Sequence, residues 1–184
     1  MFLDARSKRI VLVAHCILNQ NAISDGTAQF PGADAAVVRR LLEAGVGIVQ
    51  LPCPELNCLG LDRGDPRGGE RHVLEENTRI REAMERTAPA RILSSLVEHV
   101  AFAVEEYRRH GFAIVGLIGI DRSPSCGVNT MSRFVKEQPG RGVFVDALRN
   151  EFSARGLHVD MIGIKASEPE QASERVAELL RSKP

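Results

Sequence analysis

FAIVGLIGI, residues 112–120, is the most apolar run of the chain, and DRSPSCG, residues 121–127, follows it directly. A continuous apolar run of this length that ends in turn residues is typical of a strand buried on both faces of a parallel sheet. Shorter apolar runs cover residues 9–14, 46–51 and 157–164. The sequence therefore predicts four strands.

Helical patterns separate these strands. The spacing of apolar residues predicts helices over residues 35–44, 142–155 and 168–181. A longer charged pattern covers residues 74–110, and Pro89 divides it into two predicted helices because proline disrupts a helix interior. Strands thus alternate with helices along the chain.

This alternation predicts the fold class. Strand–helix–strand units joined by right-handed crossovers form an open, mainly parallel, Rossmann-like sheet with helices on both faces. The chain has 184 residues, of which 43% are hydrophobic, and we expect a single α/β domain over residues 1–184. A long polar loop over residues 57–71 is rich in Gly, Arg and Asp, and such loops are more often functional than idle.

Composition limits the classes of partner. The chain has 24 basic and 24 acidic residues, no Trp and one Tyr, which argues against a large nucleic-acid surface. No apolar run approaches the ~20 residues of a membrane span, and the first residues lack the pattern of a signal peptide. We expect a cytoplasmic protein with no membrane partner, whose four cysteines are reduced.

Three of the cysteines share one position in the predicted fold. Cys16, Cys53 and Cys126 each follow the carboxyl end of a predicted strand, which is the sheet edge where ligands bind. An isolated cysteine is usually a small buried hydrophobe, but three at one edge indicate a metal or iron–sulfur site. Cys58 lies in the polar loop as an inert or auxiliary thiol, or as a fourth ligand. With three ligands, a [4Fe–4S] cluster, which normally takes four thiolates, keeps one iron open.

The same residues carry a family resemblance. The motifs are CILNQ (16–20) with Asp25-Gly26 after it, Cys53-Pro54-Glu55, and SPSCG (123–127), which is the most specific. On these motifs, and on a C-terminal segment that begins at Gly142-Val143, the chain resembles the 2-thiouracil desulfidase family, formerly a family of unknown function. The match spans roughly residues 9–163.

The resemblance implies an enzyme, a desulfidase with a [4Fe–4S] cluster held by Cys16, Cys53 and Cys126. The open iron would bind the sulfur of a small thiolated substrate, a thiouracil-like nucleobase, and water would replace that sulfur without a redox change. The chain departs from the family's pattern at Asn19, at Ile23-Ser24 and over residues 56–61, and we expect these positions to shape the substrate pocket.

Further side chains are predicted to serve the reaction. Glu55 is the candidate general base, or else a loop carboxylate paired with Arg63 or Arg67. Ser123 and Ser125 flank Pro124 beside the third cysteine, where they either orient water and contact the cluster or serve as turn residues.

The first loop supplies the remaining candidates. Asp25 is predicted to hold this loop or to orient the substrate, and Asn19 and Gln20 are predicted to contact the donor and acceptor edge of a pyrimidine-like ring. Arg63 and Arg67 are either solvated loop charges or, with a nucleotide substrate, phosphate ligands.

Other classes of function remain open from the sequence. Three cysteines also suit a non-catalytic iron–sulfur protein or a zinc site completed by water. A hydrolase with Cys126 as nucleophile would need a histidine base, for which His15 and His72 are the plausible candidates.

Overall fold

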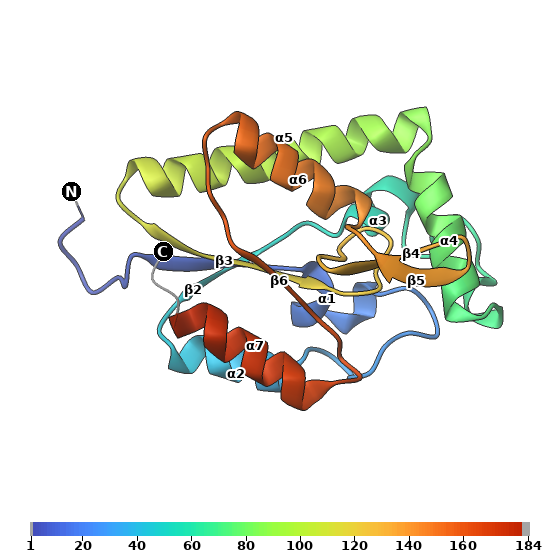
Figure 1. The fold of residues 1–184 in the computed structure, drawn as a ribbon, viewed down its shortest axis with the longest axis horizontal. Coiled ribbons are helices and arrows are strands. Elements are labelled where there is room, and N and C mark those ends of the chain that lie inside the picture. Colours follow the sequence, from blue (N-terminus) through green and yellow to red (C-terminus); the bar gives the residue numbers. More distant parts are fainter. Residues whose placement is uncertain (1, 182–184) are drawn as a thin grey trace.

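The computed structural model describes residues 2–181, which form a four-stranded parallel sheet with helices on both faces (Figure 1). The sheet contains β1 (Arg9–Val13), β2 (Gly47–Gln50), β3 (Ala113–Ile120) and β6 (Met161–Ile164), in the order β2-β1-β3-β6. All three strand pairs are parallel. The predicted α/β fold is therefore confirmed, although the fourth strand begins at Met161 rather than at residue 157.

The apolar run that predicted β3 lies at the centre of this sheet. Residues 114–119 are all buried, and β3 pairs with β1 on one side and with β6 on the other. Gly116 has a φ of 155°, and a Cβ there would lie 2.7 Å from a Leu179 methyl and 2.8 Å from the Asp160 carbonyl. Glycine at this position therefore lets the helix that contains Leu179 and the segment just before β6 approach the strand closely.

Helices cover the sheet in two layers. Figure 1 shows α5 (Thr87–Arg109) and α6 (Val143–Ala154) together on one face, with α2 (Ala35–Glu43) and α7 (Pro169–Arg181) on the other. Each helix buries an apolar stripe against the strands, and the buried side chains of both faces belong to one hydrophobic cluster. The chain thus follows the layered architecture of α/β proteins.

The break between the two predicted central helices differs from expectation. α4 (Val73–Met84) ends before Pro89, and α5 begins at Thr87. Pro89 therefore lies in the first turn of α5, where the missing backbone N–H has no helical acceptor to lose. The two predicted helices are therefore confirmed, but the break lies before Pro89 because proline is as compatible with a first turn as with a break.

Several short elements escaped prediction. They are α1 (His15–Leu18), η1 (Gln20–Ala22), α3 (Pro54–Leu59), η2 (Gly68–Glu70), β4 (Thr130–Arg133) and β5 (Lys136–Pro139). The hairpin β4–β5 turns at Phe134 and Val135, whose φ angles are 53° and 57°. Such turns usually contain Asn or Gly, and neither residue is present at this turn. The sequence therefore contains no signal for a hairpin here.

The strand order creates a crevice at the carboxyl ends of the strands. From β1 the chain crosses one face to β2, whereas β3 lies on the other side of β1. The connections that leave β1 and β3 therefore diverge, which is the arrangement that opens ligand sites in α/β sheets. Figure 1 shows α1, α3, α4 and the β4–β5 hairpin gathered at this end of the molecule.

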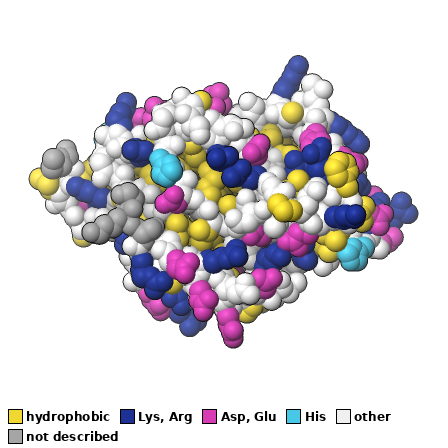
Figure 2. All heavy atoms as spheres, in the orientation of Figure 1, with side chains coloured by type: hydrophobic (Ala, Val, Ile, Leu, Met, Phe, Trp, Pro, Cys, Tyr) yellow, Lys and Arg dark blue, Asp and Glu magenta, His cyan; other side chains and the backbone are white. Residues whose placement is uncertain are grey.

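The distribution of surface charge and the character of the helices can be compared with the predictions about nucleic-acid and membrane partners. Figure 2 shows acidic and basic side chains interspersed over the displayed face, without a large region of one sign. None of the helices within residues 2–181 combines the length and the apolarity needed to cross a membrane.

Candidate metal centre and active site

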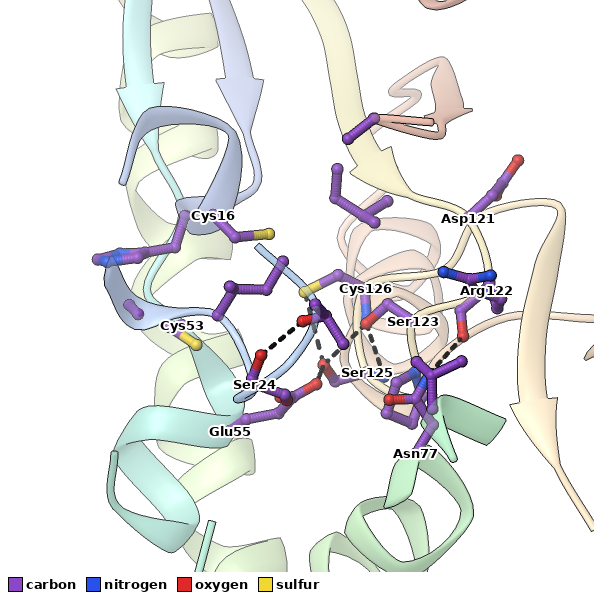
Figure 3. A pocket seen from close by; sticks show the side chains of 18 of the residues that line it. Cys16, Ser24, Cys53, Glu55, Asn77, Asp121, Arg122, Ser123, Ser125 and Cys126 are labelled. Atoms are coloured by element: carbon purple, nitrogen blue, oxygen red, sulfur yellow. Dashed lines mark hydrogen bonds between the residues drawn. The ribbon is translucent and has the colours of Figure 1, made fainter. Parts of the chain in front are cut away.

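A pocket opens at the carboxyl ends of the strands. Its hollow, including the open mouth, is about 830 Å³, and its lining includes Cys16, Cys53 and Cys126 (Figure 3). These thiols come from the segments that follow β1, β2 and β3. The structure therefore brings together three cysteines that are widely separated in sequence.

Local structure positions each thiol. Cys16 lies in α1, and Cys53 caps α3, with its sulfur accepting from the Leu56 N–H at 3.4 Å. Cys126 lies in the turn after β3, where its own N–H donates to Ser123 Oγ at 2.9 Å. All three are free cysteines.

Burial keeps these thiols neutral. Desolvation raises the pKa of Cys16 to about 12 and raises the pKa of Cys126 well above its ordinary value of 9.0. Burial also raises the pKa of Cys53. The charge of Cys53 contributes to the shift at Cys16, and the charges of Cys16 and Cys53 contribute at Cys126, so the thiols lie within electrostatic reach of one another. A cationic centre that binds them would compensate this mutual repulsion and stabilise the thiolates.

The spacing of the thiols bears on the kind of metal. Within residues 2–181, no three His, Cys, Asp or Glu side chains are placed to hold a single metal ion. The described residues therefore show no preformed site for a single metal ion. A [4Fe–4S] cluster differs because each thiolate binds its own iron, so its ligands surround a larger group.

Cys58 lies outside the pocket lining, although the charge of Cys53 also contributes to its raised pKa. Its thiol donates to the Pro89 carbonyl at 3.4 Å, and burial raises its pKa to about 11. It does not belong to the lining of the pocket. These contacts fit the interpretation of Cys58 as an inert thiol.

A buried ion pair forms one wall of the pocket. Arg63 is 2% exposed and Glu55 is 7% exposed, and Arg63 Nε donates to Glu55 Oε2 at 3.0 Å. Arg63 Nη1 donates to the carbonyls of Gly60 at 3.0 Å and Leu61 at 2.9 Å, and Nη2 donates to the carbonyl of Ala22. Arg63 is therefore neither a solvated loop charge nor a phosphate ligand, because its donors are occupied inside the protein. Its pair with Glu55 is the one given above as the alternative to a general base.

The Glu55 carboxylate reaches the third cysteine through a serine. Ser125 Oγ donates to Glu55 Oε1 at 2.5 Å and lies 3.7 Å from the Cys126 sulfur. Ser24 Oγ donates to the other carboxylate oxygen at 3.2 Å. Figure 3 shows Glu55 between Ser24 and Ser125, on the side of the pocket that faces Cys126.

Ser123 has a different role from its neighbour. Its Oγ accepts from the N–H groups of Cys126 at 2.9 Å and Ser125 at 3.3 Å. Ser123 therefore organises the cysteine turn, although it also belongs to the pocket lining.

Asp121 also stabilises the turn that carries Cys126. Its Oδ1 accepts from the N–H groups of Val128 at 3.1 Å and Asn129 at 2.8 Å. A Cβ on Gly163 would lie 1.9 Å from this oxygen, and a Cβ on Gly119 would lie 2.4 Å from the Cys126 carbonyl. The glycines of β3 and β6 thus make room for the segment that carries the third thiol.

Three predicted substrate or catalytic residues do not reach the pocket. Asn19 Oδ1 accepts from the Asn21 N–H at 3.1 Å, and Gln20 Nε2 donates to the Cys16 carbonyl at 2.8 Å. Asp25 Oδ1 accepts from the Gly26 N–H at 2.9 Å. Asn19, Gln20 and Asp25 hold the loop after β1 and do not line the pocket. The structure thus supports the loop-holding alternative for Asp25.

Asn77 is a pocket residue that was missed from the sequence, whereas Ser24 is one of the positions expected to shape the pocket. Ser24 binds the Glu55 carboxylate, and Asn77 of α4 donates to Ser132 Oγ at 3.1 Å and to the Arg122 carbonyl at 3.4 Å. Neither residue belongs to a recognisable motif. Their position depends on how α4 and the first loop pack over the sheet edge.

The thiol-nucleophile alternative has no histidine that is hydrogen-bonded to Cys126 among the described residues, although His15 lines the pocket. His15 Nδ1 lies 2.8 Å from Gln50 Nε2, and His72 Nδ1 accepts from the Leu74 N–H at 3.4 Å. Neither histidine pairs with Cys126, whose side-chain partner is Ser125. Because burial also raises the pKa of Cys126, its thiol is poorly suited to nucleophilic attack.

Comparison with known proteins identifies a relative of this chain. No family model matches the chain. Over 148 residues it is 32% identical to the uncharacterized protein MJ0003 of Methanocaldococcus jannaschii, an alignment that covers 78% of this chain and 86% of that protein. The chain belongs to the same family as MJ0003. This relative is uncharacterized, so membership assigns no activity.

The structure is also similar to a solved structure described as the [4Fe-4S]-dependent thiouracil desulfidase TudS. The likeness covers 92% of this chain and 99% of that chain, with 18% identity and a TM-score of 0.44. We draw no functional conclusion from a likeness at this level.

Proposed function

We propose that this protein is an iron–sulfur enzyme that removes sulfur from a small thiocarbonyl compound, such as a thiouracil-like nucleobase. The observation that carries the proposal is one open pocket that contains three cysteines and a carboxylate–serine pair. The motif resemblance to thiouracil desulfidases, found on the same residues, supports it independently of the geometry.

The donor set suits a [4Fe–4S] cluster held by Cys16, Cys53 and Cys126. Hydrogen-bond donors already point at two of the sulfurs, from the Leu56 N–H to Cys53 and from the Ser125 hydroxyl to Cys126. Such donors stabilise thiolates and tune clusters. When bound, the cluster supplies an iron without a protein thiolate, a soft Lewis acid that suits a thiocarbonyl sulfur.

The net reaction needs water and no electrons. The carbon–sulfur double bond becomes a carbon–oxygen double bond, and the sulfur leaves as hydrogen sulfide with the two protons of the water. Glu55 is the group in the pocket best placed to accept a proton from that water. Arg63 and Ser24 hold its Oε2, while Oε1 faces Ser125.

Ser125 lies between the Glu55 carboxylate and the Cys126 sulfur. Its hydroxyl has both Glu55 Oε1 and the Cys126 sulfur within reach. The serine therefore positions the carboxylate and excludes other orientations of it.

The test starts with protein purified without oxygen. We expect a brown protein with a broad absorption shoulder, with about four irons and four acid-labile sulfides per chain, and release of sulfide and uracil from 2-thiouracil. Cys126→Ala should lose iron and activity, whereas the matched variant Cys58→Ala should retain both. Glu55→Gln should retain iron and lose turnover.

Two results would contradict the proposal. A colourless protein containing zinc would exclude the cluster. A protein that contains the cluster but releases no sulfide from any thiocarbonyl compound would instead be a carrier or a sensor.

A further inference from the structure

One amide oxygen in the pocket wall accepts no hydrogen bond from the protein. Asn77, on α4, lines the pocket and is only 7% exposed. Its Nδ2 is bonded to the protein, whereas its Oδ1 has no donor among residues 2–181. This oxygen is not sealed inside the protein either, because the enclosed side-chain atoms without a partner in the same range are His15 Nε2 and Arg81 Nε. Oδ1 of Asn77 is therefore open to the pocket.

The neighbouring groups fix which way the Asn77 amide points. Its Nδ2 donates to Ser132 Oγ at 3.1 Å and to the Arg122 carbonyl at 3.4 Å. The Ser132 hydroxyl itself donates to the Arg122 carbonyl at 2.7 Å, so its oxygen is left to accept. A reversed amide would place Oδ1 against these two acceptors, which is unfavourable. The nitrogen therefore faces the protein, and the oxygen faces the pocket.

The β4–β5 hairpin holds α4 in the position that this orientation requires. Ser132, on β4, is fully buried and bonds to Asn77, and the Val135 N–H donates to Thr78 Oγ1 at 2.9 Å. The second bond comes from the turn in which Phe134 and Val135 both have positive φ angles, a conformation that is rare for a β-branched residue. Two consecutive residues of α4 are thus bonded to one hairpin. Figure 3 shows Asn77 on the side of the pocket away from Cys16.

We infer that Asn77 Oδ1 accepts a hydrogen bond from a ring N–H of the substrate and thereby determines specificity. The inference rests on the proposed function and narrows its substrate class to thiocarbonyl rings that carry a free N–H. An amide held by its nitrogen offers only an acceptor, which a ring N–H satisfies and an N-alkyl group does not. An N-alkyl substrate would leave this oxygen with neither water nor a donor, which is costly for a buried polar group.

The kinetic test compares three substrates on the cluster-loaded protein. They are 2-thiouracil, 1-methyl-2-thiouracil and 3-methyl-2-thiouracil, and each methyl compound lacks one of the two ring N–H groups. We expect kcat/KM to fall about ten- to a hundredfold for one methyl isomer, the range for an unsatisfied buried acceptor, and to change less for the other. The sensitive isomer identifies the N–H that binds Asn77.

Substitutions at Asn77 separate hydrogen bonding from steric exclusion. Asn77→Leu keeps nearly the same size without an acceptor, so kcat/KM for 2-thiouracil should fall to about the level of the sensitive isomer and the preference should disappear. Asn77→Asp retains an oxygen at this place and should retain the preference. The matched control is Glu75→Leu, on the exposed face of the same helix, which should leave the preference unchanged. The iron content and Tm of each variant report whether it is folded and loaded.

A binding measurement separates this inference from the proposed function. Uracil, 1-methyluracil and 3-methyluracil carry the same ring N–H groups without the sulfur, and titration calorimetry measures their affinities without turnover. The wild type should bind uracil about tenfold or more tightly than the sensitive methyl isomer. Asn77→Leu should bind the two equally.

Each outcome decides the matter. An Asn77-dependent preference in binding without any sulfide release would refute the proposed function and support the role of Asn77. Sulfide release with equal kcat/KM for all three substrates, or with a preference that persists in Asn77→Leu, would support the function and overturn the inference. The absence of both turnover and Asn77-dependent binding would overturn both.

Discussion

The buried ion pair of the pocket wall makes a strong prediction about stability. Arg63→Met replaces the guanidinium with an unbranched apolar side chain, so the positive φ of 56° is equally strained in both proteins. The change leaves the buried Glu55 carboxylate without its cation and removes donors from the carbonyls of Ala22, Gly60 and Leu61. Breaking a buried pair by removing one partner costs about 3–5 kcal/mol. For a chain of this size, that loss lowers Tm by about 6–20 °C.

Urea unfolding, followed by circular dichroism, measures this cost. Wild type and variants are prepared together, and the iron content of each is determined so that cluster loss is not mistaken for loss of the ion pair. Arg67→Met is the matched control, because Arg67 is exposed in the same loop, and its effect should lie within about 0.5 kcal/mol. The double variant Arg63→Met/Glu55→Met removes both charges and should recover part of the loss, so the two single costs should not add.

Two results would refute this reasoning. An Arg63→Met variant within about 1 kcal/mol of the wild type would show that the buried charge is not held by this pair. A double variant whose cost equals the sum of the single costs would show that the two side chains act independently.

Three further predictions concern the rest of the site and the fold. Arg79 and Arg71 lower the pKa of the buried Glu76 below its ordinary value of 4.5, so the carboxylate's contribution to stability is complete above that value and is lost as pH falls through the folded pKa. The acid unfolding curve of Glu76→Gln should lack this pH-dependent loss of stability. A curve identical to that of the wild type would contradict the prediction. Gly163→Ala would place a Cβ 1.9 Å from an Asp121 oxygen and should lower the midpoint of thermal unfolding sharply. Gly32→Ala is the control, because a Cβ there has no atom within 4 Å. Equal midpoints for the two variants would disprove the packing argument. Ser125→Ala should retain iron and lower kcat by up to about a hundredfold, because the carboxylate loses its 2.5 Å donor; full turnover would remove the serine from the site.

The cysteine positions could be predicted because each follows a strand, of which β1 and β3 are buried and β2 is a partly exposed edge strand. The apolar runs that became β1, β2 and β3 are local features of the sequence, and each thiol follows one of them in the chain. Parallel strands end at one edge, so the convergence of the thiols in one pocket follows from strand assignments alone.

The hairpin and the arginines could not be predicted in the same way. The turn at Phe134 and Val135 has two left-handed residues without glycine, so its sequence resembles an ordinary apolar pair. Arg63 and Arg67 lie in the same polar loop, yet one is 2% exposed and the other is exposed. Nothing in their immediate sequence distinguishes a buried cation from a solvated one.

The sequence by itself determined the α/β layers and the strand ends that carry thiols, since hydrophobic periodicity and turn residues act over a few neighbours. The tertiary structure alone decided that Ser125 donates to a carboxylate 70 residues away and that the same carboxylate forms a buried ion pair with Arg63. These relations depend on how separate loops pack over one sheet edge. The energy of such contacts is set by burial and distance in the folded protein, which no local pattern records.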